Sequence, residues 1–399
     1  MFFECLIGRS IFNNLVSIRT ICYFLLLINT LFIFKKGYKI NQDKSLVIFG
    51  LYYIIIGLIH CSFWGNGYKF YLYPFIFPLF VCFFSNIQTV TNISLERCKK
   101  ILIYIAVYFI IINIILYFID LPIWNKSRPW GRITRGYSTV DVITLNLTLI
   151  LLLIDKTINL KFYKRLFLTF VVTIGIIVQA SGSGMVYLII IYVSTFYLCI
   201  KKKKDIYFKE IKKTLGLLFI TIFLFLTSAF TYISIKYPYI SNGFIYMVSS
   251  RALVIIGQSN DNNTNTMEMR KKQGEIANKT FIKNDTDFLL GIGFSSISLT
   301  ERTNQTLYIE EQYSLNKITI GYIGNSLFIL IILYNLYKLR YLKELYLRIM
   351  YGCFWTIFAL SCKTVVPLNI VPLIIYYSFY YTLFYKELKG IKHIRAPRL

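Results

Sequence analysis

The feature that most constrains this chain is a repeated alternation of long apolar runs with short charged connectors. A helix needs roughly 20 apolar residues to cross a hydrocarbon core about 30 Å thick, and many of the runs reach or approach that length. With 56% of its 399 residues hydrophobic, the chain carries more apolar surface than a soluble core can bury. The alternation therefore predicts an all-α, polytopic integral membrane protein.

We expect about 11 transmembrane helices, in a range of roughly 10 to 12. The expected spans are Thr20–Phe34, Leu46–Phe63, Phe70–Phe84, Ile101–Ile119, Val140–Ile154, Leu166–Ala180, Met185–Ile200, Thr214–Ile235, Thr319–Tyr337, Ile349–Cys362 and Ile370–Tyr385. They define an N-terminal transmembrane bundle (1–235), a long outer loop (236–318), and C-terminal transmembrane helices with a basic tail (319–399).

Lysine and arginine gather on every second connector, and such residues mark the cytoplasmic side. The basic sets are Lys35, Lys36, Lys39 and Lys44; Arg97, Lys99 and Lys100; Lys156, Lys161, Lys164 and Arg165; Lys201–Lys204, Lys209, Lys212 and Lys213; Lys338, Arg340, Lys343 and Arg348; and the tail from Lys386 to Arg398. The pattern places the N-terminus outside and the C-terminus in the cytoplasm. Contact of these residues with anionic lipid accounts for most of the +26 charge, so no nucleic-acid partner is expected.

The same alternation places the long polar interval from Lys236 to Lys317 outside, and no other connector has comparable room for chemistry. Its basic residues, which include Arg251 and Arg270, are matched by acidic ones. Residues 267 to 282 have the spacing of a helix. We expect this outer loop to form helical segments that lie over the membrane face.

One shorter outer connector breaks the charge rule, because it carries Lys126, Arg128, Arg132 and Arg135. Guanidinium groups match phosphate oxygens bidentately and stay charged at any working pH, so one interpretation is a phosphate clamp. The alternative is that these side chains only contact lipid phosphates, or that the predicted topology is wrong here. Asp141, at the mouth of the next span, is expected to pair with one of these arginines.

Ser181-Gly182-Ser183-Gly184 joins two expected spans with almost no loop. Its backbone N–H groups and the following helix N-terminus could hold an anion through Ser181 and Ser183. A simple tight turn explains the motif equally well. Asn146 is expected to form a hydrogen bond between helices.

The eight cysteines lie in or beside apolar runs, and the two histidines are far apart in the chain, so neither a disulfide framework nor a zinc site is expected.

The order of these features resembles the bacterial O-antigen and capsular polysaccharide polymerases (Wzy-type) of the O-antigen ligase superfamily. The likeness lies in the Ser/Gly turn, the arginine-bearing outer loop, Leu-Leu-Gly-Ile-Gly-Phe at 289–294, and the acidic-residue, Tyr and Gly-x-x-Gly entry into a span at 311–324. It covers about Gly175 to Leu333. Ser183-Gly184 departs from the Ser-Arg of many relatives, and no acid immediately precedes Gly321.

The resemblance implies a multi-pass glycosyltransferase of the bacterial inner membrane, with its active loop outside. It would transfer a growing glycan from undecaprenyl pyrophosphate to the non-reducing end of a carrier-linked repeat unit, with a chain-length regulator as a further partner. Such a transfer needs no metal or cofactor in principle.

The charges in the loop suit that chemistry, since positive charge favours a leaving pyrophosphate and a carboxylate can take a hydroxyl proton. Arg270 and Glu311 are therefore the expected catalytic residues, with Glu310 and Glu275 as further carboxylates. Arg251 and the arginines at 128, 132 and 135 would bind pyrophosphate. More simply, Arg270 could pair with Glu268 or Glu275, and Glu311 could be a solvated carboxylate.

Two other activities stay open. An O-antigen ligase would resemble this chain over the same region but characteristically carries a histidine in the outer loop, where this sequence has none. A flippase or transporter of lipid-linked glycans would be expected to show internal repeats and charged or broken helices deep in the bilayer. No convincing repeat is present.

Overall fold

The computed structural model describes residues 48–52, 55–56, 95–119, 138–178, 182–236, 272–292, 311–363, 376, 379–380 and 382–384. Within these ranges all regular structure is helical. The chain divides into two compact units. The first comprises Met1–Val16, Ser94–Thr264 and Leu342–Phe354, and the second comprises Ser17–Ile93, Asn265–Tyr341 and Trp355–Leu399.

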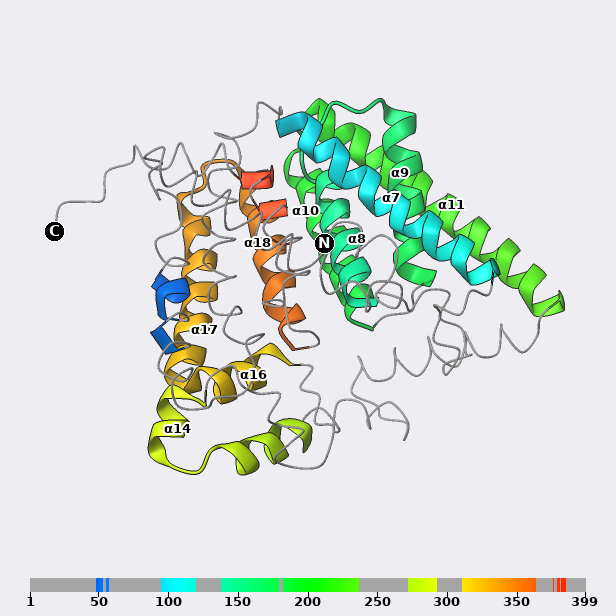
Figure 1. Cartoon of the computed structure of the whole chain (residues 1–399). Helices are drawn as coiled ribbons and strands as arrows, with labels where there is room; N and C mark the ends of the chain where they lie inside the picture. Colours follow the sequence, from blue (N-terminus) through cyan, green and yellow to red (C-terminus); the bar gives the residue numbers. More distant parts are fainter. Residues whose placement is uncertain are drawn as a thin grey trace. The chain divides into compact units, whose positions relative to one another are not determined.

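The helices carry the labels of Figure 1. Those of the first unit are α7 (Leu95–Ile119), α8 (Ser138–Leu153), α9 (Phe162–Val178), α10 (Gly182–Lys201) and α11 (Ile206–Lys236). Those of the second are α14 (Asp285–Leu290), α16 (Gln312–Thr319), α17 (Gly321–Tyr337) and the 3₁₀ helix η1 (Lys338–Tyr341), together with helical residues 272–281. The last, α18 (Leu345–Ser361), contributes to both units.

Each expected span from Ile101 to Cys362 coincides with one of these helices. Among the described residues, three helices are long and apolar enough to cross a membrane: Gly182–Lys201, Ile206–Ser228 and Gly321–Tyr341. Val142–Leu153 and Leu345–Ser361 are shorter apolar helices. The other expected spans lie wholly or largely outside the described residues, so the total of about 11 and the three-segment division of the chain stay predictions.

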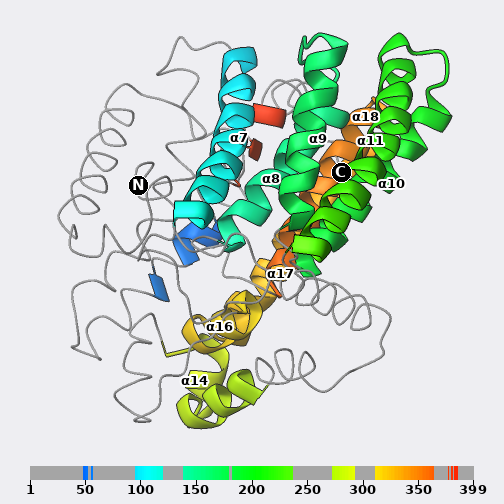
Figure 2. The same ribbon diagram turned by 90° about the vertical axis from the view of Figure 1, so that its right-hand side faces the viewer.

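In the first unit, α8 is the central helix and packs against α7, α9 and α10 (Figure 2). Its residues from Val142 to Leu153 are buried on every side, as expected for a helix that is apolar all round. The interhelical hydrogen bond predicted for Asn146 is wrong. Its Nδ2 donates instead to the carbonyl of Val142, one turn earlier in the same helix, at 2.8 Å.

In the second unit, α17 has two distinct faces. Its buried face includes Gly324, Phe328 and Ile332. The ring of Phe328 packs against that of Phe49 with centroids 5.5 Å apart. The opposite face is exposed and largely apolar. A helix with one packed face and one apolar exposed face suits a span that borders lipid.

Candidate functional site

Two segments of the second unit that are distant in sequence meet backbone to backbone at Gly291 and Gly321. Both glycines have positive φ, 78° and 70°. The N–H of Ile292 donates to the carbonyl of Ile318 at 2.8 Å. Ala277, Phe281, Ile292 and Ile318 form a buried cluster beneath this contact. We call residues 272–292 and 311–320 the loop lobe, because these contacts join them into one packed element beside the N-terminal end of α17.

Local hydrogen bonds determine where α14 starts and ends. The side chain of Asn284 accepts from the N–H of Asp287 at 2.7 Å, and the carboxylate of Asp287 accepts from the N–H of Lys283 at 3.2 Å. This reciprocal arrangement is close to a capping box. At the other end, Gly291 closes the helix by donating its N–H to the carbonyl of Asp287. The sequence Asn-Asp-Thr-Asp at 284–287 therefore marks the start of this short helix, and Gly291 marks its end.

Glu311, the predicted catalytic base, is half-buried at the N-terminal end of α16. The Oγ of Ser314 donates to its Oε2 at 2.7 Å. A helix N-terminus favours a negative charge at this position. Because Glu311 is only partly buried, its carboxylate also stays open to solvent, and the simpler interpretation of a solvated carboxylate remains an alternative. One hydrogen bond orients the carboxylate, and a carboxylate oxygen has capacity to accept further protons or hydrogen bonds.

Contacts with the end of α18 hold α16 in place. The backbone N–H of Gln312 donates to the carbonyl of Cys362 at 2.8 Å. The hydroxyl of Tyr313 donates to the carbonyl of Ala359 at 3.1 Å. Burial raises the pKa of the Tyr313 hydroxyl above its usual value, and the hydroxyl therefore stays protonated as a donor. The two residues that follow Glu311 are thus held by hydrogen bonds to the end of α18, and these bonds fix the start of α16.

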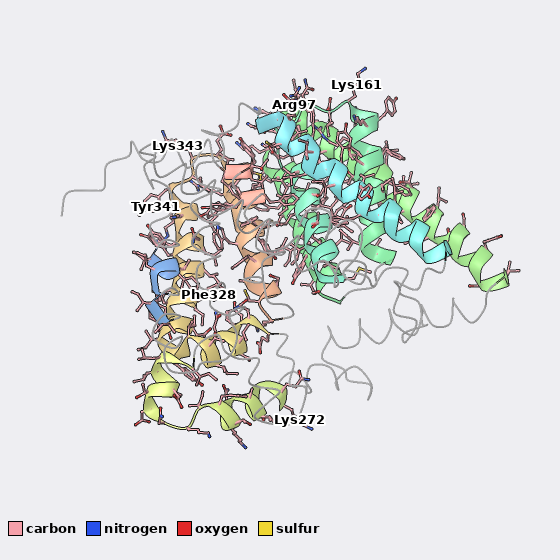
Figure 3. All side chains as sticks on the ribbon, viewed as in Figure 1. Arg97, Lys161, Lys272, Phe328, Tyr341 and Lys343 are labelled. Carbon is pink, nitrogen blue, oxygen red and sulfur yellow. The ribbon has the colours of Figure 1, made fainter. Side chains whose placement is uncertain are left out.

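The helix at 272–281 lies against Ser314, the residue that donates a hydrogen bond to Glu311. A Cβ added to Gly274 would fall 3.1 Å from the Oγ of Ser314, so only a small residue fits between the two segments. The side of this helix that packs inward carries Gly274, Ala277 and Phe281, whereas Ile276 is 44% exposed. Lys272, at its start, is exposed (Figure 3). This helix therefore packs next to Ser314, whereas Arg270 lies outside the described residues.

Two buried amides beside Glu311 were not singled out in the sequence. The Nε2 of Gln312 donates to the Oδ1 of Asn316 at 2.7 Å, and both residues are fully buried. The Nδ2 of Asn316 finds no hydrogen-bond partner among the residues that the structure describes. Buried amides normally find partners, so this unused donor sets Asn316 apart from most buried side-chain amides. The i, i+4 spacing on a short polar helix was the only available signal.

Most of the predicted site residues lie outside the described residues: Arg251, Arg270, Arg128, Arg132, Arg135, Ser181 and Glu310. The side chain of Asp141 also falls outside them. Ser183 is half-buried in the first turn of α10, in the first unit. Glu275 is exposed on the helix at 272–281. Of the residues assigned to catalysis, the structure describes Glu311 alone, and the phosphate-binding roles stay predictions.

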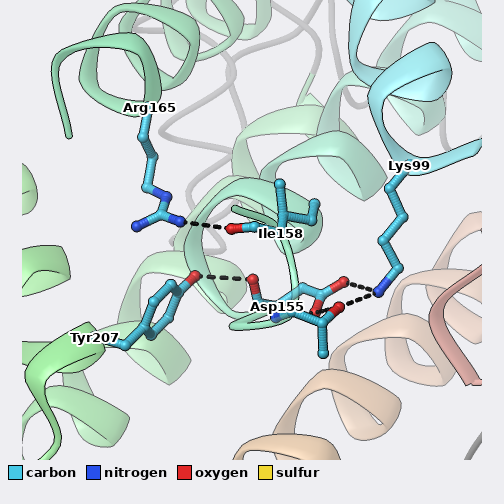
Figure 4. Close-up of polar contacts among 6 residues, drawn as sticks. Lys99, Asp155, Ile158, Arg165 and Tyr207 are labelled. Atoms are coloured by element: carbon cyan, nitrogen blue, oxygen red, sulfur yellow. Dashed lines mark hydrogen bonds and ion pairs between the residues drawn. The ribbon is translucent and has the colours of Figure 1, made fainter. Parts of the chain in front are cut away.

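A second polar cluster lies in the first unit, on connectors that the sequence marks as cytoplasmic (Figure 4). Lys99 forms an ion pair with Asp155, and both side chains are almost fully buried. The ammonium of Lys99 also donates to the Oγ1 of Thr157 at 2.6 Å. Tyr207 donates its hydroxyl to the carbonyl of Asp155 at 3.0 Å. These contacts join α7, the α8–α9 connector and α11.

Arg165 completes this cluster. Its guanidinium donates to the carbonyl of Ile158 at 3.0 Å, lies 4.7 Å from the ring centroid of Tyr207, and comes within 3.9 Å of the Glu210 carboxylate. The two cations and two carboxylates balance each other. The charges are paired, and three of the four are buried, whereas the Glu210 side chain is 49% exposed. We therefore interpret this cluster as a structural connection between helices and not as a reaction site.

No family model matches this sequence, and a search of curated proteins finds no match. Within the described residues, no group of three or more His, Cys, Asp or Glu side chains is arranged to hold a metal ion. The prediction of a metal-independent reaction stays a prediction. The functional assignment depends on the motif resemblance and on the geometry of the loop lobe.

Proposed function

We propose that this protein is a membrane glycosyltransferase that polymerises polysaccharide repeat units in O-antigen or capsule biosynthesis. It transfers a growing oligosaccharide from undecaprenyl pyrophosphate to the non-reducing end of a lipid-linked repeat unit, in the bacterial inner membrane. The supporting observation is the junction of Gly291 with Gly321. It brings together the two motifs on which the resemblance depends, Leu-Leu-Gly-Ile-Gly and Gly-x-x-Gly, through one glycine of each, and the loop lobe, which contributes Gly291 to this junction, also carries Glu311.

In the proposed reaction, an acceptor sugar hydroxyl attacks the anomeric carbon of the donor glycan. A carbon–oxygen bond forms there as the bond from that carbon to the pyrophosphate oxygen breaks. The hydroxyl proton passes to the carboxylate of Glu311, which Ser314 orients. The pyrophosphate leaves as an anion, and Arg270 and Arg251 supply the positive charge that stabilises it. The arginines at 128, 132 and 135 bind carrier pyrophosphate, and Ser181, with Ser183 in the first turn of α10, offers anion-binding groups.

A complementation assay tests this proposal. The gene is deleted in its host, and the wild type, Glu311→Gln, Arg270→Ala and Asp285→Asn are restored at matched membrane levels. Surface glycan is then resolved by length on a gel. Asp285 is an exposed carboxylate of the same lobe and serves as the control. We expect the deletion to leave glycan capped at one repeat unit, the control to restore the ladder, and Glu311→Gln and Arg270→Ala to fail.

Other results would identify the alternatives. Long carrier-linked polymer that accumulates unattached in the deletion strain would indicate a ligase. Unpolymerised units retained on the cytoplasmic face would indicate a flippase. A full ladder from Glu311→Gln would remove Glu311 as the base.

A further inference from the structure

The exposed face of α17 is an apolar stripe that one polar residue, Ser326, interrupts. Its members recur at helical spacing along one side of the helix: Ile323, Ile329, Leu330, Leu333, Tyr334 and Tyr337. With η1, α17 forms one of the segments long and apolar enough to cross a membrane. In such a span this stripe is the surface that meets lipid.

Both ends of the stripe carry tyrosine rings paired with cations. At the C-terminal end, the ammonium of Lys338 lies 4.8 Å from the ring centroid of Tyr334, and the guanidinium of Arg340 lies 4.7 Å from that of Tyr337. At the N-terminal end, the ammonium of Lys317 lies 5.3 Å from the ring centroid of Tyr322.

Tyrosine concentrates at both water–membrane interfaces, and a lysine or arginine beside the end of a span can anchor that end at the interface. From Tyr322 to Tyr337 the helix rises roughly 22 Å, and cationic side chains extend beyond both ends, so the pairs are spaced to mark the two interfaces of one bilayer.

The helix α14 extends the stripe beyond the N-terminal end of α17. The ring of Phe288 stacks on that of Tyr322, with centroids 4.0 Å apart and planes inclined by 22°. Phe288 is nevertheless 41% exposed, and the next residue, Leu289, is 44% exposed. Figures 1 and 2 show α14 at this end of α17, and Figure 3 places Tyr341 at the other. Apolar side chains that adjoin a lipid-facing stripe at the depth of a Tyr–Lys pair are placed to enter the same lipid.

We propose that α14 is an interfacial anchor: Phe288 and Leu289 insert into the boundary between headgroups and acyl chains of the bilayer that α17 crosses. Tyr322 and Lys317 lie at the level of the lipid phosphates. The anchor holds the Gly291–Gly321 junction at the membrane surface, and with it the loop lobe that carries Glu311. This interaction does not depend on the glycan chemistry proposed above, since any activity of the lobe would be confined to the same depth.

Photocrosslinking in intact membranes tests the anchor. The full chain is made with the photoreactive amino acid p-benzoylphenylalanine at one position at a time, in cells whose phospholipids carry radioactive phosphate. Positions Phe288 and Leu289 test the proposal. Leu330, exposed in the middle of the α17 stripe, is the lipid-facing reference. Lys272, exposed in the loop lobe on the side away from α17 (Figure 3), is the solvent-facing reference. Membrane levels of the four variants are matched.

We expect the probes at 288 and 289 to take up phospholipid label about fivefold more than the probe at 272, and within about twofold of the probe at 330, because an interfacial helix buries its apolar face among lipids. Label at 288 and 289 that only equals the label at 272 would overturn the anchor. So would cross-links to a protein, seen as a larger band, which would show that α14 binds a partner or a second copy. Absence of lipid label at 330 would overturn it as well, because α17 would not border lipid.

Discussion

Gly291 and Gly321 are packed so closely that a Cβ on either residue would fall 2.5 Å from the backbone nitrogen of the other. At Gly321 the added atom would also lie 2.1 Å from the carbonyl oxygen of Leu289. These neighbours are backbone atoms, which cannot rotate away as the end of a side chain can. Both residues also have positive φ, where side chains other than glycine are strained. The junction of the loop lobe with α17 therefore requires glycine twice.

The first prediction follows from that requirement. Gly321→Ala and Gly291→Ala should each separate the α14 segment from α17, at a cost of several kcal/mol from combined overlap and strain. Limited trypsin digestion of the solubilised protein measures the effect, since Lys279 and Lys283 lie in the segment that would be released. Gly216→Ala in α11 is the control, because a Cβ there meets nothing within 4 Å. Digestion of Gly321→Ala at the wild-type rate would contradict the prediction.

The second prediction concerns the ion pair of Lys99 and Asp155, whose side chains are only 3% and 1% exposed. Lys99→Met alone leaves the carboxylate of Asp155 buried without its partner, which typically costs about 3–5 kcal/mol. The double variant Lys99→Met/Asp155→Leu should recover most of that loss, because two apolar groups replace two charges. Thermal unfolding in detergent gives the comparison.

The control for this pair is Lys100→Met, since Lys100 pairs with Glu96 on the exposed side of the same helix. Its midpoint should stay at the wild-type value. A double variant no more stable than Lys99→Met would show that the pair does not act as a unit.

The third prediction is a pH dependence. Burial raises the pKa of the Tyr313 hydroxyl above its usual value near 10, so the folded protein favours the protonated phenol more than the unfolded chain does. The stabilisation is present in full below the ordinary pKa and is lost as pH rises above it. Tyr313→Phe should therefore lower the melting temperature at pH 8, because the variant loses the hydrogen bond to Ala359. Between about pH 10 and 11 the melting temperature of the variant should fall less steeply with pH than that of the wild type. Parallel curves would contradict the assigned titration.

Apolar runs predicted where the described helices lie but not where they begin. The expected span Thr214–Ile235 is the second part of α11, which starts at Ile206 and includes Lys209 and Lys212. In the sequence those lysines resemble a connector, because the apolar pattern predicts only the part of a helix that lies within the membrane. Backbone hydrogen bonds can continue the same helix into water. The length of a run therefore identifies the span better than it identifies the helix ends.

The candidate site was harder to predict from the sequence than the helices were. Glu311 could be selected because it stands where the polar loop ends. The contact of Gly291 with Gly321 could not be predicted from the sequence. A glycine shows where positive φ is allowed, but not which distant segment of backbone it contacts. The pair of Gln312 and Asn316 was likewise hidden, because burial of polar side chains depends on the tertiary packing of α16.

The last prediction concerns orientation. The helix α11 is continuous over 31 residues, which corresponds to about 46 Å and exceeds a hydrocarbon core of about 30 Å. Its two ends therefore lie on opposite sides of any membrane that it crosses. The connector before it carries Lys201–Lys204, and such a run favours the cytoplasm.

A green fluorescent protein joined after Lys204 should fluoresce, and alkaline phosphatase joined after Ile292 should be active, because the first folds inside the cell and the second requires export. Exchanging the two reporters should abolish both signals. The reverse pattern would place the loop lobe in the cytoplasm, and a carrier-linked acceptor outside the cell could then not reach Glu311.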